Sequence, residues 1–220
     1  MSDGRLVALE LSGTGAGVWS VTALRPDGTV DPSFAASTSG VVATLLSPAS
    51  PARLAVGADD RINVAGDDPV SGTRVVRLTG AGAPSPFATS SAVDGSITRA
   101  SRPLSGIALS SDGRPYLAAT PDDGAQNTKI RVERLATDGS LDASFNPTGA
   151  EPGILEIARS CCSYDRSVTT DHHDRLIVTG ALRGGVSFLS FAARFAPAGR
   201  CRRSFRSPGV ACSIREPTQP

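Results

Sequence analysis

One segment recurs four times along the 220-residue chain, and this repeat constrains the fold more than any other feature. Its clearest copies are LRPDGTVDPSF (24–34) and LATDGSLDASF (135–145). LTGAGAPSPF (78–87) is shortened, and FAPAGRCRRSF (195–205) is degenerate. The closing phenylalanines follow one another at steps of 53, 58 and 60 residues: Phe34, Phe87, Phe145 and Phe205. The turn glycines do so at steps of 54, 57 and 60: Gly28, Gly82, Gly139 and Gly199.

A second segment recurs in phase with the first. Its copies are DGRLVAL (3–9), DRINVAG (60–66), DGRPYLA (112–118) and DRLIVTG (174–180). Their arginines are separated by 56, 53 and 61 residues: Arg5, Arg61, Arg114 and Arg175. Because two independent markers keep the same period, we interpret the chain as four copies of one structural unit.

Each unit has the pattern of about four short strands. An apolar run such as INVAG follows the arginine, and an alternating run such as KIRVERL precedes the Asp-Gly turn. A third run begins near a glycine (40–46, 95–100, 153–158, 209–214), and a fourth precedes the next unit (53–56, 106–110, 167–170). No segment shows sustained helical periodicity.

Four strands per unit at this period predict an all-β, β-propeller-like fold with four repeats of 53–61 residues. A single sheet cannot bury both of its faces, whereas radially stacked sheets bury one another. The predicted domain covers 1–217, with units at about 3–58, 59–110, 111–172 and 173–217 and a tail at 218–220. The alternatives are a sandwich or barrel of roughly 15 strands and, with less support, a β-solenoid.

The paired segments resemble the delta-60 repeat of bacterial proteins, most of them large and surface-associated or secreted. Residues 134–145 (RLATDGSLDASF) match the pattern almost completely, and the resemblance spans essentially the whole chain. Units two and four depart from it, with Ala81 and Ala198 in place of Asp27 and Asp138, and Ser85 and Arg202 in place of Asp31 and Asp142. The resemblance implies a propeller-like fold, an extracellular or cell-surface location and no established activity.

Strand counting leaves the ring incomplete. The chain opens at a DGR strand and ends after GVACSI (209–214), which makes fifteen predicted strands rather than sixteen. We therefore expect either a small four-bladed ring with a short closing blade or part of a larger propeller. An open piece would expose an apolar sheet face and an unpaired edge, so self-association is possible.

Composition restricts the function classes. The 22 basic and 21 acidic residues nearly cancel, which argues against a nucleic-acid partner. No apolar window is long enough for a membrane span, and no signal peptide is visible at the N-terminus. The chain has only two histidines and ten aromatic residues, so little catalytic chemistry is available.

The only histidines lie in the tetrad Asp171-His172-His173-Asp174. Together with Cys161 and Cys162 they could be read as a zinc site, but adjacent residues of an extended chain point in opposite directions. The tetrad also occupies the place of GADD and SSDG in other units, which favours a turn. A Ser-His-Asp hydrolase is disfavoured because no G-x-S-x-G elbow occurs.

The remaining motifs have simpler interpretations. Residues 13–17 (GTGAG) precede a strand rather than a helix, so we expect a hairpin loop and not a phosphate site. Asp27, Asp31, Asp138 and Asp142 are expected to cap turns rather than bind Ca²⁺. The basic cluster Arg200, Arg202, Arg203 and Arg206 is expected to be solvated surface, with an acidic partner as the alternative.

Cys201 and Cys212 form the candidate disulfide, because they could meet across a hairpin of the last unit. The other interpretation is four buried free thiols.

We predict a non-catalytic repeat module that serves as a scaffold or binding platform in a secreted or surface protein. No catalytic, metal-binding or cofactor-binding residue is assigned, and a protein or carbohydrate ligand of unknown identity is expected. One alternative is a propeller-type glycan hydrolase or lyase, which would need carboxylates from several units to converge. The other is a purely structural or assembly segment.

Overall fold

The computed structural model describes residues 1–12, 18–36, 41–43, 46, 50–68, 72–90, 95–100, 103–120, 130–157, 163–184 and 187–200. These residues form fourteen strands in four antiparallel sheets, with one short 3₁₀ turn, η1 (Phe34–Ala36). In each sheet the strands follow one another in chain order, so every sheet is a meander. The fold is therefore an all-β, propeller-like stack of four repeated sheets, as the sequence predicts.

The sheets are offset from the repeats by one strand, because the second, third and fourth sheets each take their first strand from the end of the preceding repeat. The first sheet contains β1 (Leu6–Ser12), β2 (Val18–Leu24) and β3 (Val41–Ala43). The second contains β4 (Ala52–Val56), β5 (Ile62–Asp68), β6 (Gly72–Leu78) and β7 (Ile97–Arg99). The third contains β8 (Leu104–Leu109), β9 (Pro115–Ala119), β10 (Ile130–Arg134) and β11 (Ile154–Ile157), and the fourth β12 (Ser163–Thr170), β13 (Leu176–Gly184) and β14 (Ser187–Phe195).

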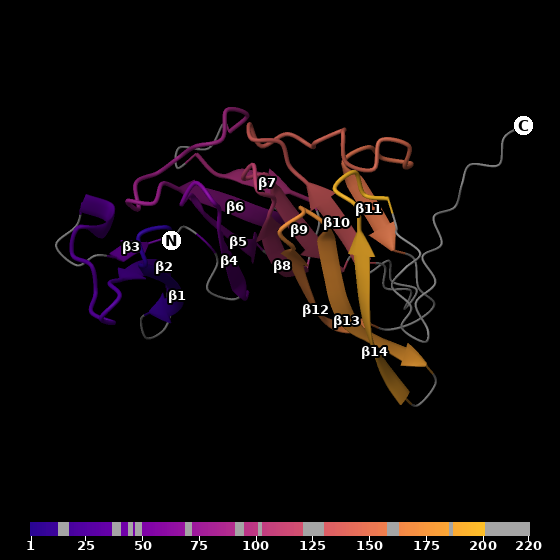
Figure 1. The fold of residues 1–220 in the computed structure, drawn as a ribbon, viewed down its shortest axis with the longest axis horizontal. Helices are drawn as coiled ribbons and strands as arrows, with labels where there is room; N and C mark the ends of the chain where they lie inside the picture. Colours follow the sequence, from indigo (N-terminus) through magenta and orange to yellow (C-terminus); the bar gives the residue numbers. More distant parts are fainter. Residues whose placement is uncertain are drawn as a thin grey trace, which may run out of the picture.

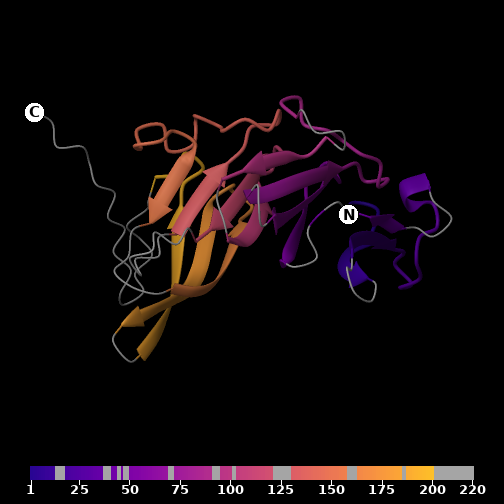
Figure 2. The same ribbon diagram turned by 180° about the vertical axis from the view of Figure 1, so that it is seen from behind.

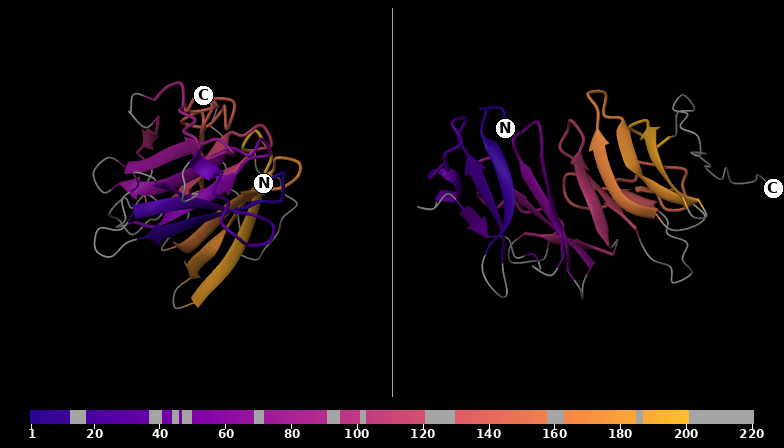
Figure 3. Two further views of the ribbon diagram at one scale, coloured as in Figure 1. Left: turned by 90° about the vertical axis from the view of Figure 1, so that its left-hand side faces the viewer. Right: turned by 90° about the horizontal axis from the view of Figure 1, so that it is seen from below.

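The sheets stand side by side in an open arc. The first sheet lies at one end and the fourth at the other (Figures 1 and 2), and the view from below shows the four in a row (Figure 3). Neighbouring sheets touch mainly through the first described strand of each sheet: β1 contacts β4, β4 contacts β8, and β8 contacts β12. Of the two predicted arrangements, the described residues form the open one rather than a four-bladed ring.

Successive apolar side chains of a strand point to opposite faces of its sheet, which explains why the sheets stack. In β5, Ile62 and Val64 belong to an apolar cluster shared with the first sheet, whereas Ala65 belongs to one shared with the third. Both faces of the second sheet are thus covered by its neighbours, as radial stacking requires.

Three apolar clusters fill the three contacts between sheets, which we call seams. The repeated phenylalanine of each preceding sheet lies in the seam: Phe34 in the first seam, Phe87 in the second and Phe145 in the third. Each is at most 2% exposed. A large buried side chain of this kind stabilises a core by about 3–5 kcal/mol relative to alanine.

Strand counting is confirmed where the structure describes the chain. Among the described residues, the first sheet begins at its DGR strand, β1, and lacks the first strand that β4, β8 and β12 supply to the other sheets. The fifteenth predicted strand (209–214) lies outside the described residues. Within the described part of the chain, no helix is long and apolar enough to cross a membrane.

Candidate functional site

The two repeated sequence segments meet at one end of each sheet. In the first unit, Arg5 of the DGR segment forms an ion pair with Asp31 of the Asp-Gly turn at 3.1 Å. In the third unit, Arg114 and Asp142 form the same pair at 2.7 Å. The DGR turns (1–5, 57–61, 110–114 and 171–175) and the Asp-Gly turns thus build one polar rim along the arc. We take this rim as the candidate functional site.

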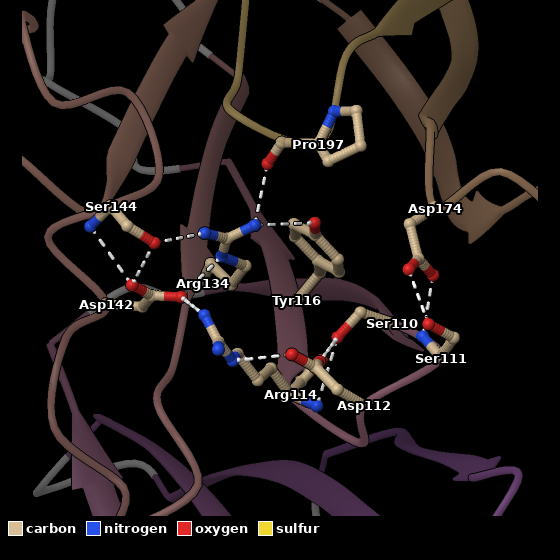
Figure 4. Close-up of polar contacts among 10 residues, drawn as sticks. All are labelled: Ser110, Ser111, Asp112, Arg114, Tyr116, Arg134, Asp142, Ser144, Asp174 and Pro197. Carbon is tan, nitrogen blue, oxygen red and sulfur yellow. Dashed lines mark hydrogen bonds and ion pairs between the residues drawn. The ribbon is translucent and has the colours of Figure 1, made fainter.

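The third unit has the densest polar network of the rim (Figure 4). Asp142 accepts hydrogen bonds from the backbone N–H and hydroxyl of Ser144, at 3.0 and 2.6 Å. Its other oxygen, Oδ2, receives Arg114 and lies 2.7 Å from Nε of Arg134. Burial opposes ionisation, but the Ser144 and Arg114 hydrogen bonds prevail and hold the pKa of Asp142 at about 2. Asp142 is therefore a permanent anion that holds structure together.

Arg134 joins the third sheet to the fourth. Its side chain is buried and donates to the Pro197 carbonyl at 2.6 Å, to the Ser144 hydroxyl at 2.7 Å and to the Tyr116 hydroxyl at 3.3 Å. The guanidinium also lies 5.1 Å from the centre of the Phe145 ring. Burial of the Tyr116 hydroxyl raises its pKa. A buried cation surrounded by fixed acceptors serves to lock the seam.

A second link crosses the same seam between the two DGR turns. The backbone N–H and hydroxyl of Ser111 both donate to the carboxylate of Asp174 in the next sheet (Figure 4). The first seam repeats this contact, with Ser2 donating to Asp60. Asp60 and Asp174 have φ angles of 60° and 57°, a left-handed conformation that aspartate tolerates better than most residues. Their side chains thereby face the preceding sheet.

The rim also presents exposed groups with chemical capacity. Asp112 is 51% exposed, and its carboxylate faces Ser110 and Arg114, whereas Asp174 faces Ser111 (Figure 4). His172 and His173 are exposed in the adjoining turn, with ring centres 3.8 Å apart. Carboxylates and imidazoles are side chains that can accept, donate and transfer protons.

The tetrad 171–174 is a turn between β12 and β13, as its alignment with GADD and SSDG indicates. Asp171 accepts hydrogen bonds from the backbone N–H groups of His173 and Arg175 and from the Arg175 side chain. These bonds outweigh partial burial and hold the pKa of Asp171 at about 2. In the described ranges, no group of three or more His, Cys, Asp or Glu residues is arranged to hold a metal ion.

The aspartates considered for calcium cap turns in the structure. Asp27 accepts the Thr29 N–H and hydroxyl, and Asp138 accepts those of Ser140. The other candidates from the sequence fall outside the described residues: the loop 13–17, Cys161, Cys162, Cys201, Cys212, Arg202, Arg203 and Arg206. The disulfide between Cys201 and Cys212 therefore stays a prediction.

Sequence reasoning missed the Arg–Asp pairs that join the two segments. The sequence contained a signal for these pairs. Asp31 and Asp142 occur in the two units whose first segment is Ser-Asp-Gly-Arg, and Ser85 and Arg202 replace them in units two and four. In those units Arg61 and Arg175 pair with Asp59 and Asp171 of their own turns, each at 2.6 Å.

Comparisons with known proteins agree with the fold. Residues 110–145 match the family model described as "Domain of unknown function (DUF5122) beta-propeller". The match supports a bacterial β-propeller repeat family and does not distinguish the delta-60 repeat within it. No curated protein sequence is significantly similar to the chain.

Among solved structures, the chain is similar to the PQQ-bound aldose sugar dehydrogenase of Streptomyces coelicolor, with 13% identity and a TM-score of 0.49. That match covers 90% of this chain and 68% of the other. The intramolecular trans-sialidase of Ruminococcus gnavus gives 11% identity and 0.48, covering 90% and 42%. The arabinanase Arb43A of Bacillus subtilis gives 14% identity and 0.45, covering 87% and 70%.

These comparisons correct one prediction. The sequence predicts a non-catalytic scaffold, but the sugar dehydrogenase, the trans-sialidase and the arabinanase are all enzymes, so that prediction is wrong. At such identities and TM-scores the likeness concerns the fold alone and argues for no particular reaction. The physical reason for the error is that scarce histidine does not exclude chemistry based on carboxylates, of which the rim has many.

Proposed function

We propose that the chain acts on glycans, as a hydrolase or lyase, at the rim between the third and fourth sheets. The observation that carries this proposal is that two neighbouring turns bring Asp112 of the third sheet and Asp174 of the fourth to the same seam (Figure 4), with His172 and His173 in the turn of Asp174. Glycosidic bonds are cleaved by a proton donor and a base that flank the scissile bond.

The positions of these groups suggest how the roles divide. We assign the base to Asp174, the carboxylate beside the two histidines, and the proton donor to His172 or His173. In a lyase the imidazole would instead remove the proton next to a uronate carboxylate.

The test is to incubate the purified chain with neutral and uronate-containing polysaccharides and to measure released reducing ends. Ultraviolet absorbance of the unsaturated product separates a lyase from a hydrolase. Asp174→Asn is the diagnostic variant, since asparagine keeps the left-handed backbone, and its amide can accept the Ser111 N–H and donate to the Ser111 hydroxyl. We expect it to lower the rate by about 100-fold or more, which is the usual contribution of a general base.

Asp60→Asn is the matched control. Asp60 has the same backbone conformation and the same serine partner, but it lies in the first seam, where alanine and aspartate replace the histidines. It should retain the wild-type rate. Release of no sugar from any polysaccharide, or equal rates for the two variants, would contradict the proposal.

We further propose that the repeats are delta-60 units and that the protein works at the cell surface or outside the cell. The match of the third unit to a β-propeller family model and the residues 134–145 support the first part. A glycan substrate would support the second, because bacterial polysaccharides are most abundant at the surface.

A further inference from the structure

We propose that two copies of this chain associate head to tail, so that the fourth sheet of each copy stacks on the first sheet of the other. The two open arcs would then close into one ring of eight sheets. Three observations support this arrangement: what every seam contains, what the first sheet leaves uncovered, and the order of the four turns.

All three seams are built from the same contacts. A residue one or two positions after the repeated phenylalanine donates its N–H to the carbonyl of the residue before the next turn glycine: Ala35 to Ala81 at 2.6 Å, Thr89 to Asp138 at 3.0 Å, and Asn146 to Ala198 at 3.0 Å. An arginine of the preceding sheet also reaches a carbonyl of that turn: Arg5 to Gly80, Arg77 to Thr137, and Arg134 to Pro197, at 3.1, 2.8 and 2.6 Å. One sheet therefore supplies the arginine and phenylalanine, and the next receives them on a turn.

The turn glycine is the centre of each receiving surface. A Cβ added at Gly82 would lie 2.9 Å from the Phe34 ring, at Gly139 2.9 Å from Phe87, and at Gly199 3.1 Å from Phe145. Gly28 holds the same position in the first sheet, yet nothing in the described chain lies within 4 Å of its Cβ position. The first sheet thus has the receiving turn of the repeat, and no other described sheet is seated on it.

Apolar side chains around Gly28 lead to the same conclusion. Leu6 on β1 is 63% exposed, whereas its counterparts at the start of β5 and β13, Ile62 and Leu176, are fully buried against the preceding sheet. Val30 is 45% exposed, whereas its counterpart Leu141 packs against the second seam. Leu6 shows the difference most clearly, because its position is buried in the other three sheets, whereas Pro84, the counterpart of Val30 in the second sheet, is exposed. This face of the first sheet we call the receiving face.

The order of the turns indicates that the fourth sheet of a second copy is the occupant. Units one and three carry Ser-Asp-Gly-Arg, whereas units two and four carry a left-handed aspartate directly before the arginine, so the two kinds alternate. The fourth sheet should thus stack on a first sheet as the second sheet stacks on the third. Arg194 on β14 occupies the register position of Arg77 and Arg134.

A head-to-tail contact joins two different surfaces, and it closes into a ring when the rotation between copies allows it. The open arc leaves its first and fourth sheets at opposite ends (Figure 3), so each end is available to a second copy. Two identical seams would then form for each pair of copies, and both receiving faces would be covered.

The test is sedimentation equilibrium of the purified chain across a wide range of concentrations. We expect the wild type to have twice the mass of the chain. Leu6→Arg places a charge on the receiving face and should yield a monomer, with at least a tenfold rise in the dissociation constant. Because Leu6 is mostly exposed within one chain, circular dichroism and the melting temperature at low concentration should stay unchanged.

Leu11→Arg is the matched control. Leu11 lies on the same strand and is 48% exposed, but its side chain belongs to the opposite face, the one that Val7 and Leu9 turn toward the second sheet. This variant should remain a dimer. A wild-type monomer at every concentration, as expected if another occupant belongs on the receiving face, would overturn the proposal. Equal masses for the two variants, or masses that keep rising beyond a dimer, would overturn it as well.

Discussion

At the scale of single residues, the repeat is held together by pairs of an arginine with a buried aspartate. Asp142 has an 8% exposed side chain and is satisfied by a serine and two arginines. Removing one partner of such a network leaves buried charges uncompensated, which is far more damaging than losing a surface pair. The Asp-x-Ser part of the repeat is thus explained by the arginine that it binds.

Asp142→Asn should lower the free energy of unfolding by about 3 kcal/mol at neutral pH, because Arg114 and Arg134 lose their shared anion. Urea denaturation followed by circular dichroism measures this loss. Glu151→Gln is the control: Glu151 pairs with Arg131 but is 62% exposed, so we expect less than about 1 kcal/mol. Similar losses for the two variants would refute the role given to Asp142.

The same carboxylate predicts how stability depends on pH. Its pKa is lowered from 3.8 to about 2 in the folded chain, so its contribution is complete above pH 3.8 and disappears as the pH falls through about 2. The shift corresponds to about 2 kcal/mol. Wild-type stability should therefore fall over this window by about 2 kcal/mol more than that of Asp142→Asn. Parallel pH profiles of the two proteins would contradict the assignment.

Contacts between neighbouring residues could be predicted from the sequence, whereas the Asp–Arg pairs between distant residues could not. Turn capping by Asp27 and Asp138 could be predicted, because it involves neighbours two residues apart. The pair between Arg114 and Asp142 could not, because those residues are brought together only when the strands between them form a sheet.

At the scale of elements, the turn glycine and the phenylalanine of the preceding sheet act as one joint. Gly82 has a φ of +80°, and its missing Cβ makes room for the Phe34 ring and for the backbone of Ala35. Gly28 has nearly the same φ, +83°, but no described atom of another sheet beside it. Comparing substitutions at the two glycines therefore separates two free-energy costs: that of a side chain at positive φ, and that of its overlap with the neighbouring sheet.

Gly28→Ala and Gly82→Ala should be compared by thermal or urea unfolding in the Leu6→Arg background, which keeps the receiving face open. Gly28→Ala should lose about 1 kcal/mol, the cost of a side chain at positive φ. Gly82→Ala should lose a further amount of about 1–3 kcal/mol, because its Cβ overlaps the Phe34 ring. Equal losses would mean that the seam does not depend on this contact.

Strands were the elements best predicted from sequence. Alternation and the turn residues located the strands of each unit that the structure describes, because both signals are local. The assignment of strands to sheets was less direct: each later sheet takes its first strand from the end of the preceding repeat, and the first sheet begins with β1.

At the scale of the whole molecule, the arc has one open receiving face and one complementary end. The sequence left a closed ring and a partial propeller as alternatives, because the angle between neighbouring sheets depends on how side chains such as Phe87 and Leu117 fill a seam. Function was the weakest prediction. The expected scaffold was inferred from the scarcity of histidine, whereas the rim gathers carboxylates and imidazoles from separate repeats.

The central claim is that the fourth sheet of one copy stacks on the first sheet of another, as neighbouring sheets stack within the chain. Small-angle X-ray scattering at concentrations well above association tests it most directly. We predict a particle of twice the chain mass whose distance distribution is that of a closed ring of eight sheets. A curve that matches a single open arc of four sheets at all concentrations would contradict it.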